Sequence, residues 1–355
     1  MAPVVGIVAN PVSARDIRRV VANATSLQIA DRANILLRVL AALHACGVRD
    51  VLMMPENGGI RAHVDRGMMR ARSRGEDIYP ALHPVSMPIT GTVADTHRAT
   101  AEMRRAGVSA LVVLGGDGTH RAVAAECGTV PIAGISTGTN NAFPEHREPT
   151  ITGLATGLAV TGRVPQHIAF AANKRIDVSL DRGANGGAVT EMALVDVALV
   201  TERYIGARAL WRTENFRELY VTFADPEVIG MSAIAGLLEP VGREESGGLM
   251  VRLSPDADCR KGTTTLHAPI APGMMARVGV TDWRRMPADV AFVPEVTAGS
   301  IALDGERELS FTERDRLSLT LRDDAFRTVN VAAVMRHAGQ NRLLTGTPVP
   351  VTAAF

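Results

Sequence analysis

The stretch Leu111–Thr119, which reads LVVLGGDGT, carries the clearest structural signal in the chain. It begins within an apolar run over residues 110–114 that is bounded by glycine, a pattern typical of a strand buried on both faces of a parallel sheet. Gly115, Gly116 and Gly118 then let the backbone turn sharply and expose N–H groups that suit phosphate oxygens. A helix-like segment follows, so we expect this turn to hold an anion at a helix N-terminus.

Asp117 is the one carboxylate among these glycines. It would lie at the carboxyl end of the strand, where ligands of open α/β sheets bind. Phosphoryl transfer needs a group that orients the attacking hydroxyl and accepts its proton, and a carboxylate can do both. Asp117 is therefore our candidate catalytic residue, although an aspartate in this place could instead cap the following helix.

Two further loops are predicted at the same edge of the sheet. The first strand, Val4–Ala9, ends at a turn that reads Asn-Pro-Val-Ser, and a later strand leads into Gly134–Pro144, GISTGTNNAFP. Hydroxyl and amide groups in these loops can bind a nucleobase edge, a ribose or phosphate oxygens. Each loop also has a plainer interpretation, because Asn-Pro can simply end a strand and asparagine can close an Asx turn. The candidate ligand-binding residues of the two loops are Asn10, Ser13, Gly138, Thr139, Asn140 and Asn141.

The strand predicted over residues 193–200 contains one carboxylate, Asp196, in the apolar run ALVDVALV. A lone carboxylate is costly to bury unless it is paired. Asp196 is therefore expected either to contact a ligand or to face water at the edge of a sheet. Further along, Asp304-Gly305 lies between strand-like flanks and is a hairpin signal. Glu306, directly after it, is a weak candidate for a second acid beside a metal ion or nucleotide.

The order of the patterns predicts the architecture. Strand and helix patterns alternate up to Asn141, which predicts an α/β domain with a doubly wound parallel sheet. From about Ile168 onward, alternating strands and turns predict an all-β domain, a β-sandwich. We place the first domain at residues 1–155 and the second at residues 156–328, with a helix in residues 329–355 joining the first. The site would lie in the cleft between the two domains.

Composition argues against several classes of protein. The 355 residues have a formal net charge of +1 and 4% aromatic residues, which argues against a nucleic-acid partner. Three widely spaced cysteines favour reduced thiols in a cytoplasmic protein. We expect neither a signal peptide nor a membrane partner, because no cationic start precedes a long apolar region and no apolar run is long enough to cross a bilayer.

Three stretches together resemble the NAD kinase and diacylglycerol kinase superfamily: residues 6–20 (GIVANPVSARDIRRV), the GGDGT turn, and residues 135–144 (ISTGTNNAFP). With residues 193–211 (ALVDVALVTERYIGARALW), they most resemble its ATP-NAD kinase-like family of acetoin catabolism protein X. The similarity extends as far as the LDGE segment at residues 303–306. It implies that ATP phosphates lie over the Asn-Pro and Gly-rich loops. The nucleotide contacts that it adds to those above are Gly115, Gly116, Gly118, Thr119 and Asp196.

The resemblance also implies an activity, that of an ATP- and Mg²⁺-dependent kinase that phosphorylates a hydroxyl of a small molecule, with NAD the first candidate. A homo-oligomer is implied as well. Three positions depart from the relatives: NAD kinases carry Asn-Glu where this chain has Val195-Asp196, and lipid kinases carry Asp where it has Asn141. Two alternatives therefore stay open, a non-catalytic nucleotide-binding regulator of acetoin or related catabolism, and a lipid kinase.

Overall fold

The computed structural model describes residues 2–11, 27–137, 141–183, 186–201, 215–255, 263–271, 273–305 and 307–345. Five residues that the sequence assigns to the site lie outside these described residues: Ser13, Gly138, Thr139, Asn140 and Glu306.

The first part of the chain is a parallel sheet with helices on both faces. Its strands lie in the order β3-β2-β1-β4-β5, and every neighbouring pair is parallel. The strands are β1 (Val4–Ala9), β2 (Asp50–Met53), β3 (Ala81–Pro84), β4 (Ala110–Gly115) and β5 (Ile132–Ser136). The helices are α2 (Ile29–Ala45), α3 (Ile60–Ser73), α4 (Val93–Arg105), α5 (Asp117–Glu126) and α6 (Pro149–Val160).

Alternate side chains of the central strands explain why both faces are covered. Ile7 and Val112 pack into one core with the apolar faces of α2, α3 and α6. Val8 and Val113 point the other way and pack with α4 and α5. All four side chains are fully buried, as the unbroken apolar runs of β1 and β4 predict. The doubly wound sheet is therefore confirmed.

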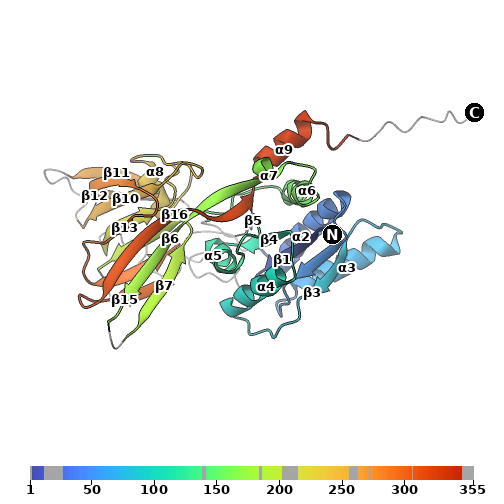
Figure 1. Ribbon diagram of the computed structural model, residues 1–355, viewed down its shortest axis with the longest axis horizontal. Helices are drawn as coiled ribbons and strands as arrows, with labels where there is room; N and C mark the ends of the chain where they lie inside the picture. Colours follow the sequence, from blue (N-terminus) through green and yellow to red (C-terminus); the bar gives the residue numbers. More distant parts are fainter. Residues whose placement is uncertain are drawn as a thin grey trace, which may run out of the picture.

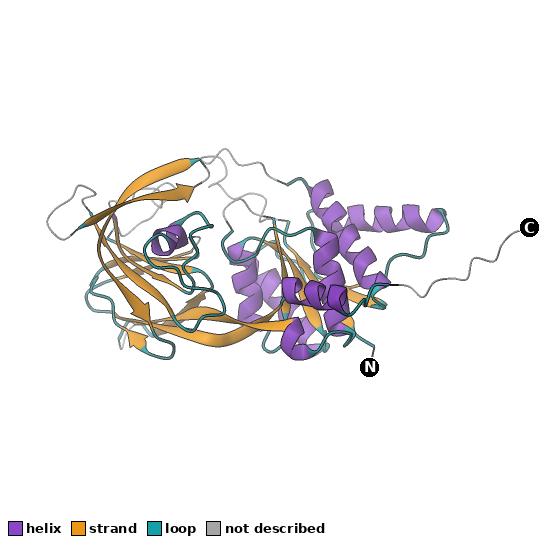
Figure 2. Cartoon of the chain, turned by 90° about the horizontal axis from the view of Figure 1, so that it is seen from above, coloured by secondary structure: helices purple, strands orange, loops and turns teal. Residues whose placement is uncertain are grey.

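The second part of the chain is mostly strand. Its elements are α7 (Gln166–Ala169), β6 (Phe170–Asp181), β7 (Ala188–Ala193), β8 (Asp196–Val200), β9 (Phe216–Val221), α8 (Met231–Gly236), β10 (Gly248–Ser254), β11 (Thr264–Ala271), β12 (Met274–Met286), β13 (Ala291–Phe292), β14 (Gly299–Leu303), β15 (Arg307–Phe311), β16 (Arg316–Val329) and α9 (Val331–Gln340). An antiparallel sheet in the order β11-β12-β10-β9-β8-β14-β15 packs on the antiparallel strands β6, β7 and β16 across a core of apolar side chains. This packing confirms the sandwich, and Figure 2 shows these strands gathered at the end of the molecule opposite most of the helices.

Two long strands join the two parts. β6 and β16 pair antiparallel from Arg316↔Asp181 to Val329↔Phe170, and Thr328 of β16 also pairs in parallel with Ile132 of β5. Figure 1 shows both strands running from the sandwich toward α7 and α9. One sheet therefore continues from the parallel part into the sandwich. The domain boundaries at residues 155 and 328 stay a prediction.

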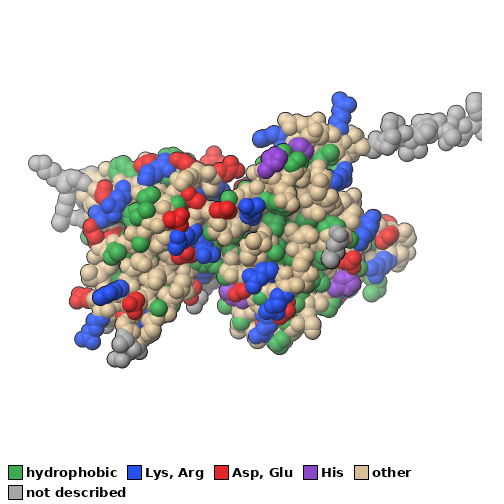
Figure 3. All heavy atoms as spheres, viewed as in Figure 1, with side chains coloured by type: hydrophobic (Ala, Val, Ile, Leu, Met, Phe, Trp, Pro, Cys, Tyr) green, Lys and Arg blue, Asp and Glu red, His purple; other side chains and the backbone are tan. Residues whose placement is uncertain are grey.

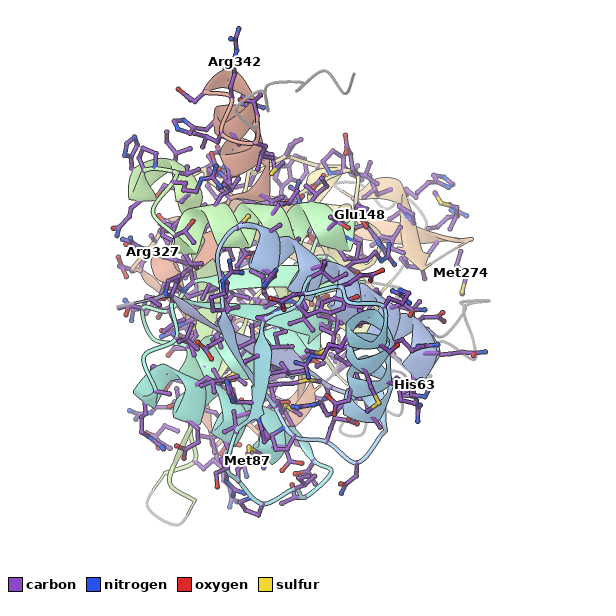
Figure 4. The ribbon with its side chains drawn as sticks, turned by 90° about the vertical axis from the view of Figure 1, so that its right-hand side faces the viewer. His63, Met87, Glu148, Met274, Arg327 and Arg342 are labelled. Carbon is purple, nitrogen blue, oxygen red and sulfur yellow. The ribbon has the colours of Figure 1, made fainter. Side chains whose placement is uncertain are left out.

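The helices α6 and α9 close the far side of the first part. Glu148 caps α6, because its side chain accepts a hydrogen bond from the backbone N–H of Ile151 at 3.1 Å. The same carboxylate pairs with Arg38 of α2, and Figure 4 shows Glu148 near the end of the α6 ribbon. Val334 of α9 is fully buried in the core that also contains α6.

The surface carries charges of both signs. Figure 3 shows basic and acidic side chains interspersed over the face in view, as a net charge of +1 suggests. Among the helices of the described ranges, none combines the length and the apolar character needed to cross a membrane.

Candidate active site

Three loops meet at one edge of the parallel sheet. In the strand register, Ala9 lies opposite Leu114, and Gly115 lies opposite Ser136. The Asn10 loop, the Gly-rich turn and the loop that begins at Thr137 therefore leave the sheet side by side, as predicted. Beneath the first of them, the fully buried Arg32 of α2 donates a hydrogen bond from Nη1 to the carbonyl oxygen of Asn10 at 2.7 Å.

The glycines of the turn are needed for close approach. A Cβ on Gly115 would lie 2.5 Å from the Thr119 side chain, and a Cβ on Gly116 would lie 2.9 Å from Oδ1 of Asn141. Asn141 is held there by a hydrogen bond from its Nδ2 to Oγ of Ser136 at 2.9 Å. The structure thus brings Asn141 against the Gly-rich turn, as the sequence predicts, and the amide packs where a side chain on Gly116 would clash.

Asp117 is the first residue of α5, and Gly116 before it, not Asp117, occupies the N-cap position. The Asp117 carboxylate instead accepts hydrogen bonds from the backbone N–H groups of Ala142, at 3.1 Å to Oδ2, and of Phe143, at 3.0 Å to Oδ1. The helix-cap alternative is therefore wrong, because the buried carboxylate joins the Gly-rich turn to the neighbouring loop.

Asp304 ties the second sheet to α5, a role that the sequence did not predict. Its carboxylate is fully buried and accepts hydrogen bonds from the N–H groups of Leu194 at 3.0 Å and Val195 at 2.8 Å. Arg121, four residues after Asp117 on α5, lies 3.3 Å from Oδ2 of Asp304 and donates to the Leu303 carbonyl at 2.7 Å. The hairpin that Asp304-Gly305 predicts is also present, because Leu303 pairs with Arg307 across the turn.

The same carboxylate corrects the strand predicted over residues 193–200. β7 ends at Ala193 and β8 begins at Asp196, because the N–H groups of residues 194 and 195 turn toward Asp304 instead of a neighbouring strand. β8 lies between β9 and β14, and the side chain of Asp196 is buried. The alternative of a water-facing residue at a sheet edge is therefore wrong for Asp196.

His120, directly after the GGDGT turn, is a further polar group that the sequence did not single out. Its ring is completely buried, and Nδ1 lies 2.9 Å from the Gly116 carbonyl oxygen, so Nδ1 carries the proton. Nε2 faces Gly134, where a Cβ would lie 2.8 Å away, and among the described residues it has no hydrogen-bond partner. Burial lowers the pKa of His120 to about 4.

We expect the protein to lose about 3 kcal/mol of stability through His120 between pH 6.5 and pH 4. In this range the unfolded chain binds a proton at His120 and the folded protein does not, so acidification favours unfolding. Denaturant unfolding at pH 7 and pH 4.5 should show a smaller pH-dependent loss in His120→Gln. The exposed His146→Gln is the matched control, and it should keep the wild-type loss. Equal losses in wild type and His120→Gln would contradict the assignment.

A resident metal cage is not evident at this edge. Among the residues that the structure describes, no group of three or more His, Cys, Asp or Glu side chains is placed to hold an ion. Mg²⁺ in nucleotide sites is commonly held by one or two carboxylates together with the substrate phosphates.

Comparison with known proteins identifies the class to which the chain belongs. Residues 5–164 match the family model of the ATP-NAD kinase N-terminal domain, and residues 174–324 match that of the acetoin catabolism protein X C-terminal domain. The fold is similar to that of yeast NADH kinase complexed with NADH, with a TM-score of 0.50 and 13% sequence identity over 99% of this chain and 89% of that one. The fold and the matched segments define a protein of the NAD kinase-like class.

The family follows from a relative of higher identity. The chain is 56% identical over 351 residues to acetoin catabolism protein X of Cupriavidus necator, which covers 99% of this chain and 96% of that protein. The chain belongs to the acetoin catabolism protein X family. The resemblance read from the GGDGT, Asn-Pro and Gly-Thr-Asn-Asn stretches is therefore confirmed.

Proposed function

We propose that the protein is an ATP-dependent kinase that transfers a phosphoryl group to a hydroxyl of a small molecule, with NAD the first candidate acceptor. The observation that carries the proposal is the buried Asp117 carboxylate, fixed between two loops at the N-terminus of α5. The NAD kinase-like match over residues 5–164 supports ATP as the donor.

The residues at this edge fit a triphosphate. The first turn of α5 and the Gly-rich turn offer backbone N–H groups and the positive end of the helix dipole. Mg²⁺ bound with ATP would neutralise charge on the phosphates. Asp117 would orient the acceptor hydroxyl and take its proton, while Asn10, Asn141 and Asp196 would bind the nucleotide or acceptor. A homo-oligomer remains part of the proposal on family grounds.

A second candidate, a nucleotide-binding regulator without catalysis, is favoured by one observation. Both oxygens of Asp117 already accept loop N–H groups, so the carboxylate also has a purely structural use. In this case ATP would bind over the same loops, and its binding would change the affinity of the protein for a partner protein of acetoin or related catabolism.

Phosphorus NMR separates the two candidates. The purified protein is incubated with ATP, Mg²⁺ and a panel of acceptors that includes NAD, NADH, polyols, sugar acids, acetoin and diacylglycerol. A new phosphoester with NAD supports the leading proposal, and one with diacylglycerol supports the lipid-kinase alternative. Saturable ATP binding with no product from any acceptor would reject the kinase and support the regulator.

A further inference from the structure

Arg243, in the segment between α8 and β10, contacts the loop that holds Asp117. Its guanidinium donates one hydrogen bond to the carbonyl oxygen of Phe143 at 3.0 Å and another to that of Ala142. The Ala142 carbonyl and the Phe143 N–H belong to one peptide group, and this N–H is the one that bonds Oδ1 of Asp117. One peptide group therefore connects the guanidinium to the candidate base.

The hydrogen bond from Arg243 strengthens the hydrogen bond that the same peptide group donates to Asp117. A carbonyl that accepts a hydrogen bond from a cation polarises its peptide group, so the N–H of the same group becomes a better donor. The planar fork of arginine can reach two successive carbonyl oxygens at once, which a lysine ammonium on a flexible stem does with less geometric control. Arg243 is thus suited to fixing the orientation of the 142–143 peptide, and with it the direction of the Asp117 carboxylate.

Arg243 is itself held from two sides. Its guanidinium lies 4.0 Å from the centroid of the Phe223 ring and 5.8 Å from that of Phe143, so the charge stacks against aromatic faces. The segment that carries it is fixed by Lys174 of β6, whose Nζ donates to the carbonyl oxygens of Gly242 at 2.9 Å, Glu245 at 2.7 Å and Gly247 at 2.7 Å.

Lys174 is a buried cation whose ammonium group bonds carbonyl oxygens of the protein itself. The residue is only 5% exposed, and burial lowers the pKa of its ammonium to about 8. Its three carbonyl bonds satisfy all three ammonium donors. Lys174 and Arg243, together with Phe143 and Phe223, also line a cavity with room for about one water molecule. Both cations therefore serve the junction between the sandwich and the loop of the first part.

We propose that Arg243 is a positioning residue that aligns Asp117 through the 142–143 peptide, and that Lys174 holds the segment from which Arg243 acts. The proposal rests on the proposed kinase function for its effect on rate. Its structural content, the fixed 142–143 peptide, is independent of that function. Both cations lie within residues 174–324, the part that matches the acetoin catabolism protein X C-terminal domain.

Arg243→Met should lower kcat by on the order of 10–100-fold, because the base is misaligned. The KM for ATP should change by no more than about twofold, because the substitution does not touch the Asn-Pro loop and the Gly-rich turn, over which the ATP phosphates are expected to lie. Arg243→Lys should restore part of the loss. Lys174→Met should act in the same direction, and the double variant should be no worse than the more damaging single variant, because both act through one segment. Arg322→Met is the control, since Arg322 pairs with Asp177 and Asp289 of the sandwich instead of this loop.

Hydrogen exchange keeps the test separate from the kinase assignment. In Arg243→Met, the amides of Ala142 and Phe143 should exchange faster than in wild type, whereas Arg322→Met should leave them unchanged. If wild type transfers no phosphate but this exchange pattern is found, the kinase proposal fails and the positioning contact stands. Unchanged exchange and a kcat within twofold of wild type in Arg243→Met would overturn the positioning role. If Arg243→Met does not fold, the same two readouts on Arg243→Lys decide the question.

Discussion

Asp117→Asn is expected to lower phosphoryl transfer by about 10³-fold while the chain stays folded. The amide keeps one oxygen that can accept an N–H from Ala142 or Phe143, so about 1–2 kcal/mol of stability is lost and the fold is retained. What the amide cannot do is take the proton of an attacking hydroxyl. The measurement is kcat with ATP and the acceptor identified by phosphorus NMR, alongside the melting temperature.

Glu126→Gln is the matched control for this change. It makes the same carboxylate-to-amide substitution on the same helix, at a partly exposed side chain whose neighbour is His97 at 3.4 Å. Its kcat should stay near the wild-type value. Transfer in Asp117→Asn within about tenfold of wild type would show that Asp117 holds the loop without acting as the base. Faster exchange of the Ala142 and Phe143 amides in Asp117→Asn would then give the structural reason.

Local sequence patterns predicted those elements whose structure depends mainly on residues nearby in the sequence. The apolar runs of β1 and β4 have apolar side chains on both faces, so they are buried only in a sheet that is covered on both sides, as parallel sheets are. The glycines at the end of β4 predicted a sharp turn, and a Cβ on Gly115 or Gly116 would indeed clash there with Thr119 or Asn141. In the same way, alternation and turn residues predicted the sandwich.

The contacts that fix the site could not be read from local pattern. Asp304 and Arg121 are separated by 183 positions, and Arg243 reaches carbonyl oxygens about 100 positions away. Such pairs depend on how two sheets are placed, and the local pattern around each residue, a hairpin signal at Asp304 and a helix start before Arg121, does not indicate the partner. His120 is a similar case, because its burial depends on Gly134 of another strand, whose missing Cβ leaves room for the ring.

The junction of the two parts was harder still to predict. From about Ile168 the sequence changes from alternating strand and helix patterns to strands and turns, which indicated a second architecture. The change gave no sign that a strand far along the chain would extend the first sheet. β16 pairs with β5 through Thr328 alone, and its other edge follows β6 for most of its length. The strand has 14 residues, and its alternation of buried and more exposed side chains over residues 316–321 is interrupted before Phe326, where its pairing with β6 also shifts register. The local pattern therefore fits either sheet, and only the three-dimensional packing decides which strands β16 joins.

Asp304→Ala should destabilise the protein by about 3–5 kcal/mol, since removing one partner of a buried ion pair leaves the other charge uncompensated. Three backbone N–H groups, those of residues 194 to 196, would lose the same acceptor, and Arg121 would lose its carboxylate. Urea unfolding, followed by circular dichroism, gives the free energy of unfolding for comparison with wild type.

Asp315→Ala is the matched control for this change, because Asp315 is an aspartate in the next turn of the chain. Asp315 accepts hydrogen bonds from the N–H and the hydroxyl of Thr312 at 2.8 and 3.1 Å, but it is only partly buried, and no arginine of the described ranges pairs with it. Asp315→Ala should therefore cost about 1 kcal/mol. Asp304→Asn should fall between the two, because the amide keeps one acceptor and loses the charge. If Asp304→Ala costs no more than Asp315→Ala, then α5 and β8 are held together by apolar packing alone. In that case Asp196 would keep its place without Asp304, and the link from Asp117 through Arg121 to the second sheet would have no energetic weight.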